Sequence, residues 1–120
     1  MKEWEVPNNI DPECRELCIA LNKVPGIHTT ESCCGHNKDH YMIWLEADNV
    51  AALNKFLWAG CFRWWCWRGN WQPILETADP NRDATTITIC LESIELGEQA
   101  YEQADIMAKG ITKFVSEYFL

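Results

Sequence analysis

The chain has few basic residues for its size and no long uninterrupted apolar segment. It contains 10 Lys and Arg against 18 Asp and Glu, which gives a net charge of −8. Because affinity for polyanions comes largely from basic side chains, this balance disfavours a nucleic-acid partner. The most apolar window, FLWAGCFRWWCW, is short and interrupted by Arg63. It cannot span a bilayer as a helix, so we predict no membrane partner either.

Glycine and proline are also scarce, and no internal repeat or low-complexity tract is visible. With 6 Gly, 5 Pro and 48% hydrophobic residues, the composition excludes disordered and fibrous classes. The 120 residues suffice for one domain, so residues 1–120 are predicted to form a single unit. The opening MKEWEVPNNIDPE lacks the basic start and apolar core of a secretory signal, and we expect a cytoplasmic protein.

Cysteine and tryptophan, by contrast, are abundant, with seven of each. An odd number of cysteines excludes a fully paired intramolecular disulfide framework. Cys33 and Cys34 are adjacent, with Cα atoms about 3.8 Å apart, below the usual disulfide separation of roughly 4.4–6.8 Å. A bond between them would be strained, so reduced thiols are expected.

Three segments carry helix signals. In residues 10–26, Asp11 is a candidate N-cap, Pro12 suits the first turn and Pro25-Gly26 ends the helix. Its apolar positions place Cys14 and Cys18 in the core. A second helix is predicted over 50–60 after a cap at 48 or 49, with Val50, Leu53 and Leu57 on one face, and a long amphipathic helix over 98–119.

Strand signals alternate with these helices. Residues 27–32, 41–47 and 85–93 alternate apolar and polar side chains, and Gly69-Asn70 predicts a hairpin between strands 62–68 and 71–77. Pro73 favours an edge position or a bulge for the second of these strands. The predicted fold is therefore α+β: a mostly antiparallel sheet of about five strands with two to three helices on one face.

The segment HTTESCCGH, residues 28–36, and the loop that follows carry the candidate site. One hypothesis is zinc, because Cys33, Cys34, His36, His40 and His28 offer five nitrogen or sulfur ligands within thirteen residues. A second is a reactive thiol, with Cys33 and His36 as catalytic candidates. A third is capture of an anionic or nucleotide-like ligand by the loop backbone, in which the contributing residues are Thr30, Ser32, Cys33, Cys34, Gly35 and His36.

The same segment resembles a motif in the tRNA-modifying methyltransferases of wybutosine synthesis. The resemblance rests on Thr29, Thr30, Ser32, Cys33 and Gly35, within LNKVPGIHTTESCCGHNKDHYMIWLEA, about a fifth of the chain. It implies a similar α+β scaffold, with the loop at an active site beside S-adenosylmethionine and a tRNA base. Small uncharacterised bacterial and phage proteins with an SC-x-GH signature look similar as well.

Two positions depart from the wybutosine pattern. Cys34 stands where that family has serine, and His36 stands where it has arginine. The second change removes a permanent positive charge from the loop. The likeness therefore indicates the scaffold and the position of the site better than it indicates methyl transfer.

The segment FRWWCWRGNW interleaves arginine with tryptophan. Such a pattern suits a single-stranded nucleic-acid platform, but an acidic chain favours a protein interface. Arg63, Trp65, Trp67 and Trp71 are the predicted interface residues, contacting another subunit or a protein partner. Three functions follow: a domain binding a small anion or zinc, an enzyme acting on tRNA or nucleotides, or a non-catalytic interaction protein such as a phage-encoded inhibitor.

Overall fold

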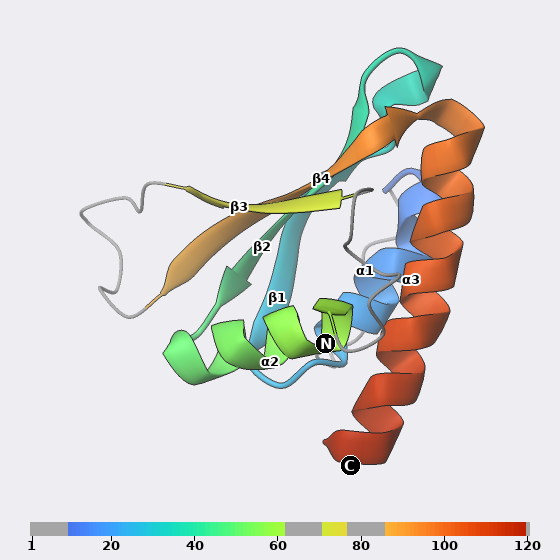
Figure 1. The fold of residues 1–120 in the computed structure, drawn as a ribbon. Helices are drawn as coiled ribbons and strands as arrows, with labels where there is room; N and C mark the ends of the chain where they lie inside the picture. Colours follow the sequence, from blue (N-terminus) through green and yellow to red (C-terminus); the bar gives the residue numbers. More distant parts are fainter. Residues whose placement is uncertain (1–9, 62–70, 77–85, 120) are drawn as a thin grey trace.

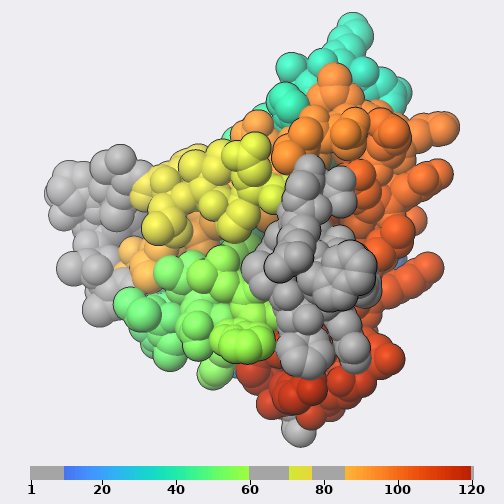
Figure 2. Space-filling view, viewed as in Figure 1, coloured from blue at the N-terminus to red at the C-terminus, as the bar shows by residue number. Residues whose placement is uncertain are grey.

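The computed structural model describes residues 10–61, 71–76 and 86–119, and they form one α+β unit (Figure 1, with the same view space-filling in Figure 2). The described elements follow one another in the predicted order. They are α1 (Pro12–Asn22), β1 (Ile27–Cys33), the short 3-10 turn η1 (Gly35–Asn37), β2 (His40–Ala47), α2 (Val50–Cys61), β3 (Trp71–Glu76), β4 (Ile87–Leu96) and α3 (Gly97–Tyr118). None of the helices in these ranges is both long and apolar enough to cross a membrane.

The described strands form one antiparallel sheet in the order β1-β2-β4-β3. The α+β prediction is confirmed, with four described strands in place of the five expected. The predicted strand 62–68 and the turn at Gly69-Asn70 lie outside the described residues. β3, which contains Pro73, stands at the end of this strand order, as expected for a residue that cannot donate a backbone hydrogen bond.

One face of the sheet carries the hydrophobic core. The alternation predicted for residues 41–47 is confirmed, because Tyr41, Ile43 and Leu45 are all fully buried. Ile89 and Leu91 of β4 pair with Leu45 and Ile43 and continue the same buried layer. α1 and α3 run side by side over this layer, and all three helices contribute buried side chains to it (Figure 1).

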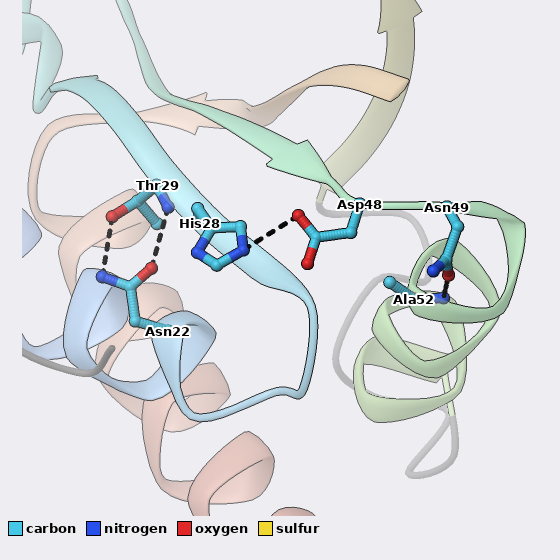
Figure 3. A network of polar contacts seen from close by, with 6 residues as sticks. All are labelled: Asn22, His28, Thr29, Asp48, Asn49 and Ala52. Atoms are coloured by element: carbon cyan, nitrogen blue, oxygen red, sulfur yellow. Dashed lines mark hydrogen bonds and ion pairs between the residues drawn. The ribbon is translucent and has the colours of Figure 1, made fainter. Parts of the chain in front are cut away.

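A buried amide joins α1 to the sheet. The Asn22 side chain, at the end of α1, accepts a hydrogen bond from the Thr29 backbone N–H at 2.8 Å. Its amide nitrogen donates to Thr29 Oγ1 at 2.9 Å (Figure 3). Because a buried polar group is costly unless it is paired, this double contact fixes how β1 leaves the helix.

The predicted face of α2 is only partly correct. Leu53 and Leu57 pack, partly buried, against the core, but Val50 is 72% exposed, and Ala52, Phe56 and Ala59 are the fully buried residues. The helix cap is correct, since Asn49 Oδ1 accepts the Ala52 N–H at 2.9 Å (Figure 3). α2 is apolar around most of its circumference, so its sequence pattern does not determine which side meets the sheet.

Gly26 gives a testable consequence of this packing. Its φ is +81°, and a Cβ there would lie 2.6 Å from Ala52 Cβ in α2. We expect Gly26→Ala to lower the free energy of unfolding by about 2–4 kcal/mol, combining left-handed strain with steric overlap. Urea unfolding would measure the change. Gly110→Ala, inside α3, is the control and is expected to be neutral or stabilising. Equal losses in both variants would contradict the prediction.

Candidate functional site

The site forms where β1 ends beside the first turn of α1. Gly35, His36 and Asn37 have φ values of +82°, +51° and +65°, so three consecutive residues are left-handed. At Gly35 a Cβ would lie 3.0 Å from the His40 carbonyl oxygen, which requires glycine. His36 and Asn37 adopt a conformation that costs non-glycine residues of order 1–2 kcal/mol each. Strain of this kind is typical of functional loops.

Asp11 links α1 to this loop. It occupies the N-cap position, but its side chain makes no cap hydrogen bond. Instead Asp11 Oδ2 accepts the Cys34 backbone N–H at 3.0 Å. This hydrogen bond lowers the pKa of Asp11, against the opposing effect of burial. Asp11 is therefore the predicted N-cap by position, but its carboxylate is held in its charged form against the loop and does not cap the helix.

Three potential metal ligands meet at this point. One ligand atom each from Asp11, Cys33 and His36 lie within 4.8 Å of one another. His36 Nε2 is 3.8 Å from Asp11 Oδ2. The Gly35 backbone N–H donates to Cys33 Sγ at 3.4 Å. The structure thus brings together Cys33 and His36 from the predicted set and adds Asp11.

Cys34 lies behind this group. Its side chain is only 2% exposed, and burial raises the pKa of the thiol. Cys34 Sγ lies 3.7 Å from His36 Nδ1. Which of these two atoms donates depends on the histidine tautomer, and in either tautomer Nε2 faces Asp11 Oδ2 at 3.8 Å. Cys34 therefore orients the histidine.

Two other predicted metal ligands are engaged elsewhere. His28 Nε2 pairs with Asp48 Oδ1 at 3.0 Å, near the start of β1 and away from the loop at its end (Figure 3). His40 Nδ1 donates to the Ser93 carbonyl oxygen at 2.7 Å. Neither belongs to the three-residue ligand group.

The predicted hydroxyl ligands also lie apart from the three-residue group. Thr30 Oγ1 donates to the Trp44 carbonyl at 3.2 Å. Ser32 points into the core, where its hydroxyl is buried without a hydrogen bond of good geometry among the described residues. It lies against the thiols of Cys14 and Cys18 and favours their charged forms, although burial dominates and raises the pKa values to about 12 and about 11.

The predicted interface is only partly covered by the structure, since Arg63, Trp65 and Trp67 lie outside the described residues. Trp71 is described, and its burial does not fit the predicted interface role. It is 3% exposed, packs edge-on against Tyr41 at 5.0 Å between ring centroids, and donates its indole N–H to Gln103 Oε1 at 2.9 Å. Trp71 is opposite Ser93 in the β3–β4 register, which places it on the helix-covered face.

Similarity to known proteins adds nothing to this geometry. No protein-family model matches the chain, and comparisons with curated proteins and with solved structures gave no match. The resemblance to wybutosine methyltransferases stays a prediction based on its motif. The contacts around Asp11, Cys33 and His36 are therefore the basis for a functional proposal.

Thiol reactivity offers a direct check on these positions. Cys33 is partly exposed, whereas Cys14, Cys18, Cys34 and Cys90 are buried. Burial raises the pKa of Cys90 to about 11, so at pH 8 only about one molecule in 1,000 carries its thiolate. Among these five cysteines we expect Cys33 alone to be alkylated rapidly by iodoacetamide in the folded protein after treatment with a chelator.

Peptide mass spectrometry would locate the label, and protein unfolded in urea is the control in which all five react. Rapid native labelling of Cys14 or Cys18 would contradict the described burial.

Proposed function

We propose that this protein binds a divalent transition metal, with zinc as the expected ion, through Asp11, Cys33 and His36. The convergence of their three ligand atoms within 4.8 Å is the observation that carries the proposal. Carboxylate oxygen, thiolate sulfur and imidazole nitrogen are all ligands that zinc accepts. In a tetrahedral site with bonds of about 2.0–2.3 Å, ligand atoms lie about 3.3–3.8 Å apart. Small side-chain rotations bring these three atoms to that spacing.

The protonation states of the neighbours support the same assignment. The hydrogen bond from Cys34 N–H keeps Asp11 ionised, and the oxygen that accepts it, Oδ2, also lies 3.8 Å from His36 Nε2. Cys34 itself stays a thiol, and its sulfur contacts His36 Nδ1, the ring nitrogen that does not face Asp11. Outer-shell partners contact metal-binding histidines in the same way. The left-handed backbone at His36 and Asn37 turns the imidazole back toward α1. The strain then has a function, namely to hold one ligand in place.

Three protein ligands leave one position of a tetrahedral ion open. Water or one oxygen of a small anion would complete the coordination, which is the arrangement of catalytic rather than structural zinc sites. This combines the two sequence hypotheses of zinc binding and anion binding in a single loop. The ligand class is a small carboxylate or phosphate, because the metal would supply the positive charge that the acidic chain lacks.

Metal analysis of protein purified without chelator tests the proposal. We expect about one zinc per chain, removable by chelator and restored on titration, with a higher midpoint of thermal unfolding in the loaded protein. Cobalt substitution gives an independent readout, because a sulfur-to-cobalt charge-transfer band requires a Cys33–metal bond. Absence of tight zinc binding and of this band would overturn the proposal.

S-adenosylmethionine is the comparison ligand, because the motif resemblance implies it. Calorimetric titration of metal-free protein with S-adenosylmethionine should give no heat of binding. Measurable binding in protein that takes up no zinc would favour the methyltransferase alternative.

A further inference from the structure

The sheet has a second face that the described helices do not cover. Strand register places twelve residues on it in three rows that cross β1, β2, β4 and β3 in turn. We call this surface the outer acidic face. Its rows are His28, Glu46, Thr88 and Glu76, then Glu31, Trp44, Cys90 and Ile74, then Cys33, Met42, Glu92 and Gln72.

The centre of the outer acidic face is apolar. Met42, Trp44, Cys90 and Ile74 are neighbours on adjacent strands. Ile74 is 40% exposed, Met42 and Trp44 are half-buried, and Cys90 between Trp44 and Ile74 is buried. None of these four belongs to the core cluster, to which α1, α2 and α3 all contribute buried side chains. The helices therefore pack on the opposite face, and the band around Trp44 is an apolar strip that no described helix covers.

The rim of the outer acidic face carries one sign of charge. Glu31, Glu46, Glu76 and Glu92 surround the apolar band, and the twelve residues include no Lys or Arg. Glu76 and Glu92 act together on the Cys90 thiol, whose pKa is raised first by burial and then by these two carboxylates. The carboxylates thus converge on the centre of the face.

We propose that the outer acidic face binds an arginine-containing segment of a partner protein. A guanidinium group can stack on the Trp44 ring while its planar fork meets a glutamate, a pairing that lysine does not reproduce. Apolar side chains next to such an arginine would contact Met42 and Ile74. A second copy of this chain is the wrong occupant, because two such faces would bring their glutamates together on chains of net charge −8.

This proposal is independent of the metal site. Cys33 lies at one corner of the outer acidic face, but the carboxylates and the apolar band that recognise the partner belong to β2, β3, β4 and Glu31. The two sites can therefore be disabled separately by substitution.

The test uses a short fluorescein-labelled peptide of alternating arginine and leucine as the probe. Binding is measured by anisotropy near 0.15 M salt, where attraction between distant charges is screened within about 8 Å. The double variant Glu76→Gln/Glu92→Gln removes two charges from the face and nearly preserves side-chain shape. Glu16→Gln/Glu102→Gln removes two charges from exposed positions on α1 and α3 and is the matched control.

We expect about tenfold weaker binding for Glu76→Gln/Glu92→Gln and less than about twofold for the control. Equal losses would show non-specific attraction to an acidic protein and would overturn the proposal. Circular dichroism establishes that both variants are folded.

A second measurement locates the probe. Amide chemical-shift changes are expected in β2, β3 and β4, with the Trp44 indole signal among them, and Trp44→Thr should weaken binding. Changes centred on α1 and α3 would overturn the assignment. So would light scattering that shows a dimer of the unmodified chain that Trp44→Thr dissociates, since the face would then be a self-contact.

Discussion

Replacing His36 by asparagine is expected to lower zinc affinity by about 100-fold or more without unfolding the protein. Structural zinc sites bind with about 10–16 kcal/mol from four ligands, so one ligand contributes roughly 3 kcal/mol. That free energy corresponds to about a 100-fold change in dissociation constant. Asparagine is the right replacement because His36 has a φ of +51°, a left-handed conformation that asparagine tolerates better than most residues.

The matched control is His28→Asn. His28 is also a histidine within the same nine-residue segment, but it pairs with Asp48 and lies outside the ligand group. Competition with a chromophoric chelator gives the affinities of both variants and of the unmodified chain. We expect His28→Asn to bind zinc within about twofold of the unmodified chain. Equal affinity in all three proteins would remove His36 from the site, and a large loss in His28→Asn would place the metal elsewhere.

Truncating Trp71 to alanine is expected to be the most destabilising of the substitutions considered. Removal of a buried tryptophan costs about 3–5 kcal/mol through lost apolar burial and a residual cavity. Trp71 packs edge-on against Tyr41, which is itself fully buried and donates its hydroxyl to the Glu13 carbonyl. Loss of the Trp71 indole also leaves the Gln103 side-chain oxygen without this donor. Such a loss is a large part of the total stability of a domain this size.

Urea unfolding of three proteins would measure this effect. Trp58→Ala is the control, because Trp58 is 54% exposed, and its cost should be below about 1 kcal/mol. Comparison of midpoints with an unchanged dependence on urea isolates the stability difference. If Trp71→Ala were as stable as the unmodified chain and changed only its oligomeric state, Trp71 would be an interface residue after all.

Periodic segments of the sequence were predicted well. α1 begins and ends where Pro12 and Pro25-Gly26 indicate, and the alternation of residues 41–47 identified the buried side of β2. Such patterns are local: a helix or strand that packs on one side repeats its apolar residues at the period of its own backbone. The α+β class follows from these elements and their order.

Residues whose neighbours are distant in sequence were predicted poorly. The sequence predicts Asp11 as a helix N-cap. Its side chain accepts a hydrogen bond from the backbone N–H of Cys34, 23 residues away, and makes none to its own helix. Trp71 belongs to an aromatic-rich segment that was predicted to form an interface. It is buried instead, and its hydrogen-bond partner Gln103 lies 32 residues further along the chain. Val50 fits an apolar stripe, and only the packing of α2 shows that it faces outward.

At the candidate site, too, local sequence patterns predicted some of the residues and missed those brought in from distant parts of the chain. Spacing alone grouped Cys33, Cys34, His36, His40 and His28, because short separations allow a loop to present any of them to one ion. The tertiary structure retains Cys33 and His36 in the ligand group and adds Asp11 from the start of α1. His28 pairs with Asp48, 20 residues away, and His40 donates a hydrogen bond to the carbonyl of Ser93, 53 residues away, so neither belongs to the ligand group.

Most of the described helices and strands, the α+β class and the loop that carries the candidate site could thus be predicted from local patterns in the chain. The tertiary structure decided which side chains meet at that loop, and it arranged the outer acidic face from four strands. The physical reason is that helix and strand periodicity depends on neighbouring residues, whereas a metal site or a sheet face depends on strand register and helix packing. Asp11 beside Cys33 and Trp44 beside Cys90 are consequences of that packing.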